Sequence, residues 1–253
     1  MLQGLVTMLE SIPIEDIQKV TVAAAESVID LHGSMDKNLI DGAAVNAMRA
    51  ALNNIAMAGT VVIGEGQKDN APMLRSGENV GNGLGIAVDI AVDPIDGTSL
   101  VAKGKVGAVS LIAFSPSNTM FNPEDNFYMY KLVTGHEAAS KVSITRPLVE
   151  NLHIIAEAKS KKINDLVVNV LRRPRHENLA LELQSLGITV RFFDDGDVTA
   201  ALATCLPHTE VDAMIGIGGS PEAVIAAAGI IALGGSIQTQ LVSKSEIETF
   251  SLN

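Results

Sequence analysis

The stretch that decides the fold is residues 86–98, which read IAVDIAVDPIDGT. Its first seven residues are rich in Val and Ile, which predicts a buried strand that ends at Asp93. Pro94 stiffens the turn that follows, and Gly97 lets the backbone approach a ligand. Asp93 and Asp96 stand three residues apart at the strand's carboxyl end, where two carboxylates can bridge Mg²⁺ or Mn²⁺. Taken alone, the stretch fits an ordinary Pro-Asp-Gly turn equally well.

Neighbouring segments favour the metal site. The β-branched run at residues 60–63 predicts another strand, and it too leads into an acidic, glycine-containing loop, which carries Glu65 and Asp69. Two strands that end in acidic loops favour a shared metal site over two unrelated turns. Asp41 has two compatible interpretations, as a helix N-cap, which is favoured by the residue alone, and as a further ligand.

The elements expected along the chain divide it into two parts. Helices at residues 14–32 and 41–55 precede the first strand, and strands at 107–114 and 127–133 are expected to pair antiparallel. From about residue 147 helices and strands alternate, which predicts a parallel sheet. We therefore expect an α/β protein with an N-terminal α+β metal-binding part, residues 1–145, and a C-terminal α/β substrate-binding part, residues 146–253. The helices expected in the second part are 149–159, 176–186, 198–205 and 221–232, and the strands 165–171, 189–193 and 211–215.

Three segments of the second part follow predicted strands and carry candidate ligand-binding groups. The basic run Arg172–His176 could hold a phosphate or form a solvated surface cluster. The acids of Asp194–Asp197 could bind sugar hydroxyls or simply cap a helix. The glycine-rich turn at residues 215–222 lacks the spacing of a dinucleotide-binding fingerprint and suits a backbone cradle for a sugar or phosphate.

Composition excludes several classes of function. The 253 residues are 47% hydrophobic, enough for a substantial core, while aromatics make up only 3% and the net charge is −11. Such a chain is not expected to bind nucleic acid or an anionic membrane, and a phosphorylated substrate would need metal cations to reverse the local field. The single cysteine, Cys205, is expected to be a packing residue. Without a signal peptide or membrane-spanning run, the protein is expected to be cytoplasmic.

Seven separated motifs resemble class II fructose-1,6-bisphosphatases, in matching order from about residue 15 to about residue 240. They are residues 41–48, 62–66, 71–74, 88–98, 173–176, 195–197 and 216–222. The resemblance implies the layered αβαβα sugar-phosphatase fold of the lithium-sensitive phosphatase superfamily. It also implies a phosphoric monoester hydrolase that depends on Mg²⁺ or Mn²⁺ and releases the 1-phosphate of fructose 1,6-bisphosphate in gluconeogenesis.

The resemblance further implies a set of site residues by motif matching. The metal ligands would be Asp41 and Glu65 for one ion, and Asp93, Asp96 and Glu222 for another. Asp69 would position or activate the attacking water, and Thr98 would orient it. The residues that contact the substrate would be Asp96, Gly97, Thr98, Tyr128, Arg173, Pro174, Arg175, Asp195, Gly196, Asp197 and Gly219.

The chain departs from the family pattern in three places. Asp96 stands where these enzymes usually carry Glu, and Gln67 stands where many have another acid. Family members also continue with further strands and helices beyond the point where this sequence ends. The second part is therefore expected to be incomplete, which leaves three interpretations: a compact variant, a homodimer or homotetramer that covers the exposed surface, and a poorly active product.

Two other functions remain open from the sequence. One is hydrolysis of another sugar phosphate such as sedoheptulose 1,7-bisphosphate, because the motifs specify phosphate chemistry better than sugar length. The other is a catalytically impaired protein that binds a sugar phosphate. This alternative is considered because the C-terminus is shorter than in the family.

Overall fold

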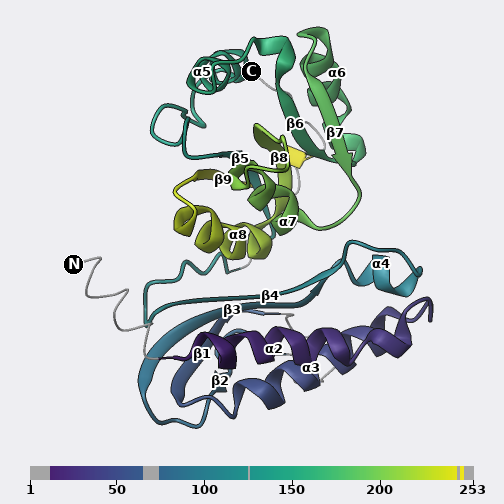
Figure 1. Ribbon diagram of the computed structural model, residues 1–253, viewed down its shortest axis with the longest axis vertical. Helices are drawn as coiled ribbons and strands as arrows, with labels where there is room; N and C mark the ends of the chain where they lie inside the picture. Colours follow the sequence, from purple (N-terminus) through teal and green to yellow (C-terminus); the bar gives the residue numbers. More distant parts are fainter. Residues whose placement is uncertain (1–11, 65–73, 125, 244–245, 248–253) are drawn as a thin grey trace. The chain divides into compact units, whose positions relative to one another are not determined.

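The computed structural model describes residues 12–64, 74–124, 126–243 and 246–247, and element labels follow Figure 1. The chain forms two compact units, Met1–Asn122 and Pro123–Asn253. Each unit has its own sheet and its own helices, so the α/β class expected from the sequence is confirmed.

The first unit is a four-stranded mixed sheet with two long helices packed on it (Figure 1). Its helical elements are α2 (Ile14–Glu26), η1 (Ile29–Leu31), α3 (Lys37–Leu52) and α4 (Thr98–Ala102). Its strands are β1 (Met57–Ile63), β2 (Asn79–Val80), β3 (Ile86–Asp96) and β4 (Val109–Pro116). The strand order is β2-β1-β3-β4, in which β1 and β3 run parallel and the other two pairs are antiparallel.

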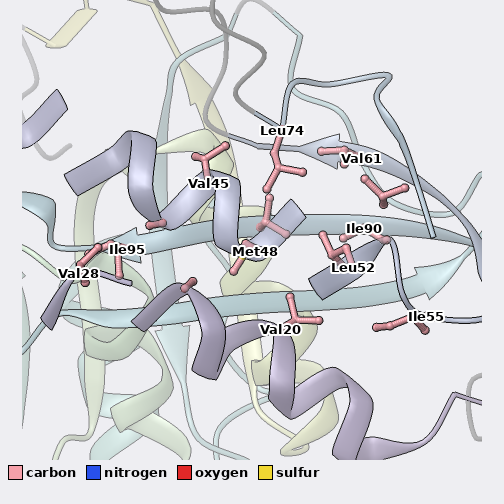
Figure 2. Packing of buried hydrophobic residues seen from close by; sticks show 14 of the residues in the cluster. Val20, Val28, Val45, Met48, Leu52, Ile55, Val61, Leu74, Ile90 and Ile95 are labelled. Atoms are coloured by element: carbon pink, nitrogen blue, oxygen red, sulfur yellow. The ribbon is translucent and has the colours of Figure 1, made fainter. Parts of the chain in front are cut away.

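The core of this unit lies between the helices and the sheet. Val45, Met48 and Leu52 recur at helical spacing on α3, are at most 1% exposed, and point toward Ile90 of β3 (Figure 2). Val20 of α2 joins the same cluster. Each fully buried aliphatic side chain contributes about 1.5–3 kcal/mol by leaving water, so this face fixes α2 and α3 on the sheet.

The N-terminus of α3 corrects one interpretation of Asp41. The helix begins at Lys37, and its N-cap is Asp36, whose Oδ1 accepts a hydrogen bond from the Leu39 amide at 3.0 Å. Asp41 lies inside the helix and is 6% exposed, so capping does not explain it.

The second unit is a five-stranded mixed sheet with the order β7-β6-β8-β5-β9. Its strands are β5 (Tyr128–Thr134), β6 (Val167–Leu171), β7 (Thr189–Phe193), β8 (Ala213–Gly219) and β9 (Ser236–Val242). Its helical elements are α5 (Leu148–Ala158), η2 (Ile163–Asp165), η3 (Pro174–His176), α6 (Glu177–Ser185), α7 (Asp197–Leu202), η4 (Ala203–Cys205) and α8 (Ser220–Ala232). Strands β7, β6 and β8 are parallel, β5 runs antiparallel to β8, and β9 runs antiparallel to β5.

Successive side chains along β6 point to opposite faces of this sheet. Val168, Val170 and Ile215 pack in one hydrophobic cluster with α5 and α6. The residue between the two valines, Asn169, points to the other face, where its Nδ2 donates to the Ala200 carbonyl of α7 at 2.9 Å. Helices therefore cover both faces of the sheet (Figure 1).

The pairing of β5 differs from the expectation. We expected the strand at residues 127–133 to pair with the strand at 107–114, but β5 pairs with β8 and β9, and β4 pairs with β3. The expected parallel sheet is consequently mixed. Because β5 belongs to the second sheet, the compact units divide between Asn122 and Pro123, earlier than the predicted division after residue 145.

None of the helices in the described ranges is both long enough and apolar enough to cross a membrane.

The core packing predicts unequal effects for two leucines of α3. Leu52→Ala should lower the free energy of unfolding by about 2–5 kcal/mol, because it opens a cavity under a fully buried side chain. Leu39→Ala is the matched control, since Leu39 is 51% exposed and should change stability by less than about 0.5 kcal/mol. Urea denaturation measures both, and equal losses would contradict this packing.

Candidate active site

The last residues of β3 in the first unit carry both Asp93 and Asp96. Asp93 pairs with Leu111 of β4 and Asp96 with Val109, so one extra residue on β3 forms a bulge between the two acids. β3 thus extends through the expected turn. Gly97 then takes φ +99°, a left-handed conformation that starts α4 at Thr98.

A hydrogen bond joins this turn to α3. Thr98 Oγ1 donates to Asp41 Oδ1 at 2.8 Å, and the Ile95 carbonyl lies 3.0 Å from the same hydroxyl. Asp41 is 6% exposed and Asp96 is 5% exposed. The fold therefore brings Asp41 of α3 to Thr98, which is 57 residues further along the chain, near the carboxyl end of the buried strand β3.

These side chains have the right chemistry for a metal ion. Asp41, Asp93 and Asp96 offer carboxylate oxygens, the donors that Mg²⁺ and Mn²⁺ prefer. In the part of the chain that the structure describes, no three Asp, Glu, His or Cys side chains cluster closely enough to form a complete metal site. Two predicted members, Glu65 and Asp69, lie outside the described residues.

In the second unit, the predicted substrate residues gather at one edge of the sheet. Parallel strands β6, β7 and β8 end at this edge, and antiparallel β5 begins there, so Tyr128 pairs directly with Gly219. The other residues of this unit that are predicted to contact the substrate lie at the ends of β6, β7 and β8 or in the segments that follow them. This is the edge at which α/β sheets usually bind ligands.

The basic segment after β6 is held in place by backbone carbonyls. Arg175 donates from Nε and Nη2 to the Ile217 carbonyl at 3.2 and 2.9 Å, and its guanidinium lies 5.6 Å from the centre of the Tyr128 ring. Arg173 donates to the Asp194 carbonyl at 3.1 Å. Pro174 begins η3 between the two arginines. Both guanidinium groups are thereby positioned near the start of β5 and the end of β7.

His176, the last residue of this segment, is a fixed structural group. Its Nδ1 lies 2.6 Å from the Leu171 carbonyl, and its Nε2 accepts from the Ile217 amide at 2.8 Å. These partners require a neutral ring with the proton on Nδ1. Burial lowers the pKa of His176, an effect opposed by the hydrogen bond to Leu171 and reinforced by the charge of Arg175. The ring thus links η3 to β8.

Glu222 lies in the first turn of α8, next to Gly219. A Cβ on Gly219 would collide with the Glu222 carboxylate, so glycine here lets that carboxylate lie against the backbone. Burial raises the pKa of Glu222, and the Lys131 ammonium opposes the increase. Its Oε2 is buried and has no hydrogen-bond partner among the described residues. A cation or a donor from a ligand would satisfy this oxygen.

Asp195, Gly196 and Asp197 form the turn that starts α7. Gly196 takes φ +87°, and its amide lies 3.2 Å from Asp195 Oδ1. Asp197 is 9% exposed, and its Oδ2 accepts from Lys131 Nζ of β5. The sequence interpretation missed Lys131, although a lysine inside the otherwise apolar run 128–134 was a usable signal.

Comparison with known proteins agrees with the resemblance seen in the sequence. The model of a protein family described as "Bacterial fructose-1,6-bisphosphatase, glpX-encoded" matches residues 13–253. The chain is 44% identical over 233 residues to fructose-1,6-bisphosphatase 1 class 2 of Escherichia coli K12, covering 92% of this chain and 69% of that protein. The fructose-1,6-bisphosphatase class 2 of Shigella flexneri matches to the same extent. Enzymes of this class are metal-dependent.

The neutral state of His176 predicts a pH dependence of stability. Its folded pKa is lowered from 6.5, so the unfolded chain binds the proton more tightly. The stabilisation is complete above about pH 6.5 and is lost as the pH falls toward the folded pKa. Thermal denaturation between about pH 7.5 and pH 5.5 should show a steeper loss for the wild type than for His176→Gln, which does not titrate. His208→Gln, at an exposed position, should behave like the wild type. Equal slopes for all three proteins would refute this explanation.

Proposed function

This chain belongs to the bacterial, glpX-encoded fructose-1,6-bisphosphatase family, and we propose that it hydrolyses the 1-phosphate of fructose 1,6-bisphosphate. The products are fructose 6-phosphate and inorganic phosphate. The observation that carries the proposal is the match along residues 13–253, and the chemistry of the described site residues supports it. For this chain we propose Mg²⁺ or Mn²⁺ as the metal and a homodimer or homotetramer as the assembly.

The acids of the first unit are proposed to bind the metal ions. Asp41, Asp93 and Asp96 would be ligands, together with Glu65 and with Glu222 of the second unit. When bound, the metal supplies positive charge that polarises the phosphoryl oxygens and offsets the repulsion between a bisphosphate and a protein of net charge −11.

Thr98 is proposed to orient the attacking water. A hydroxyl has one proton, and the two partners of Thr98 Oγ1 described above, Asp41 Oδ1 and the Ile95 carbonyl, are both acceptors for it. The oxygen of Thr98 then acts only as an acceptor, so it can hold a water through one of the water's own protons. Asp69 is proposed to position or activate this water as a general base.

The second unit is proposed to bind the sugar and the phosphate that remains. Arg175 has two guanidinium nitrogens on a backbone carbonyl, which fixes its plane before the substrate arrives. Arg173, Pro174 and Tyr128 complete the phosphate side, and the Asp195–Asp197 turn and Gly219 are proposed to contact the sugar. Binding energy from the remaining phosphate can then position the reacting one.

Two other functions are less well supported. A sedoheptulose 1,7-bisphosphatase would use the same phosphate chemistry, but the names of the relatives favour the fructose substrate. A catalytically impaired binding protein would keep the second unit's groups without turnover.

A phosphate-release assay tests the proposed activity. With Mn²⁺ added, fructose 1,6-bisphosphate should release one phosphate, and fructose 6-phosphate should release none. Asp93→Ala should lower kcat/KM by about a hundredfold or more, because it removes a proposed metal ligand.

Asp16→Ala is the control for this variant, since it removes a carboxylate from the surface of α2. Faster release from sedoheptulose 1,7-bisphosphate would favour the alternative substrate. Binding without release from either bisphosphate would favour the impaired protein.

The arginine segment predicts an effect on binding. Arg175→Ala should raise KM for fructose 1,6-bisphosphate about tenfold to a hundredfold, because it removes a charged phosphate ligand, and should change kcat by less than about threefold. Arg191→Ala, on the exposed side of β7, should leave both constants unchanged. Steady-state kinetics measure these constants, and a loss confined to kcat would argue against phosphate binding by Arg175.

A further inference from the structure

Lys131 is a buried ammonium in the middle of a central strand. It lies on β5, between β8 and β9, and is 2% exposed. Removing such a group from water costs several kcal/mol unless a partner compensates for the lost hydration. The partner is Asp197, whose Oδ2 accepts from Lys131 Nζ.

The space around this ion pair is kept clear by a glycine. A Cβ on Gly218 would lie 2.9 Å from Lys131 Nζ and would collide with the Asp197 carboxylate. The strand beside Lys131 therefore has no side chain at this point, so the carboxylate and the ammonium can meet directly over the backbone of β8. The pair depends on both strands and on the turn before α7.

Asp197 uses only one of its two oxygens for Lys131. Its Oδ1 is buried and has no hydrogen-bond partner within the described ranges, although the residue is only 9% exposed. A buried carboxylate oxygen without a donor is costly, so its presence points to a donor that a ligand brings. The pair lies against Gly218, near the end of β8, and Asp197 belongs to the sugar-binding turn proposed above.

We propose that Lys131 is a positioning residue: it holds Asp197 by Oδ2 so that Oδ1 accepts a hydrogen bond from one hydroxyl of the sugar. This inference rests on the proposed function, because it takes a phosphorylated sugar as the ligand of the second unit. Lys131 would influence which sugar binds by holding Asp197 in place, and its ammonium would not contact the substrate.

The test compares binding of fructose 6-phosphate and its monodeoxy analogues, measured by calorimetry with Mn²⁺ present. The wild type should bind one of the analogues about tenfold to a hundredfold more weakly than fructose 6-phosphate, since a hydrogen bond to a charged group is lost. Lys131→Met should bind fructose 6-phosphate at least about tenfold more weakly and should no longer discriminate against that analogue.

A second lysine provides the structural control. Lys161 Nζ donates to both oxygens of the buried Asp212, at 2.8 and 2.9 Å, near the amino ends of β6 and β8 and thus at the opposite edge of the sheet. Lys161→Met removes this pair, leaves Lys159 Nζ at 3.5 Å from Asp212 Oδ1, and should keep the discrimination. Thermal denaturation of both variants separates a loss of stability from a loss of selection.

A double-mutant cycle keeps the proposal testable if Lys131→Met folds poorly. Asp197→Ala should lose the same discrimination, and Lys131→Met/Asp197→Ala, which removes both charges, should lose no more than Asp197→Ala alone. Discrimination that persists in Lys131→Met or Asp197→Ala would overturn the proposal, as would a wild type that binds every analogue equally. These binding measurements need no turnover, so a failed phosphate-release assay alone would leave the inference standing.

Discussion

The cost of placing charged groups away from water is the constraint on which the candidate site residues of each unit depend. Asp41 and Asp96 in the first unit, and Lys131 and Asp197 in the second, are each at least nine-tenths buried. A folded chain tolerates such groups only where partners, hydrogen bonds or ligands replace the lost hydration. The Thr98–Asp41 and Lys131–Asp197 contacts are partial replacements, and each leaves acceptor capacity on a carboxylate or hydroxyl. The acids of the first unit suit a ligand that brings positive charge, and the Asp197 carboxylate of the second unit suits one that brings a hydroxyl donor.

Glycines and the neutral His176 make this arrangement possible in different ways. Gly218 and Gly219 leave room for the carboxylates of Asp197 and Glu222 to approach the backbone of β8. His176 bonds to Leu171 with one ring nitrogen and to Ile217 with the other, so it joins the end of β6 to β8. Because the Ile217 carbonyl also accepts from Arg175, one residue of β8 fixes both the histidine and the arginine. The phosphate-binding segment is thus positioned by the sheet rather than by contacts within the loop.

Local pattern in the sequence predicted the elements well, but it did not predict their pairing. The strand predicted at residues 189–193 has the same bounds in the structure, and α5 and α8 begin within one residue of the expected positions, because helical and strand periodicities are local properties. The partners of β5 are set by contacts far along the chain, so the pairing expected with the strand at residues 107–114 was wrong. Strand β9 was missed because its polar residues, Gln238, Thr239 and Gln240, interrupt the apolar signal.

The candidate site was predictable where a residue type alone reveals its chemistry. Carboxylates at strand ends and arginines after β6 were found this way, whereas Lys131 was not, because its importance comes from burial against Asp197 rather than from a motif. The burial of Lys131 matters for function because Lys131 bonds only one of the two oxygens of Asp197. An ion pair that satisfied both oxygens of Asp197 would be a structural link of the kind formed by Lys161 and Asp212. A pair that satisfies one oxygen instead fixes the direction of the other, so the fold can present a rigid acceptor to a sugar without leaving a mobile side chain to be ordered on binding.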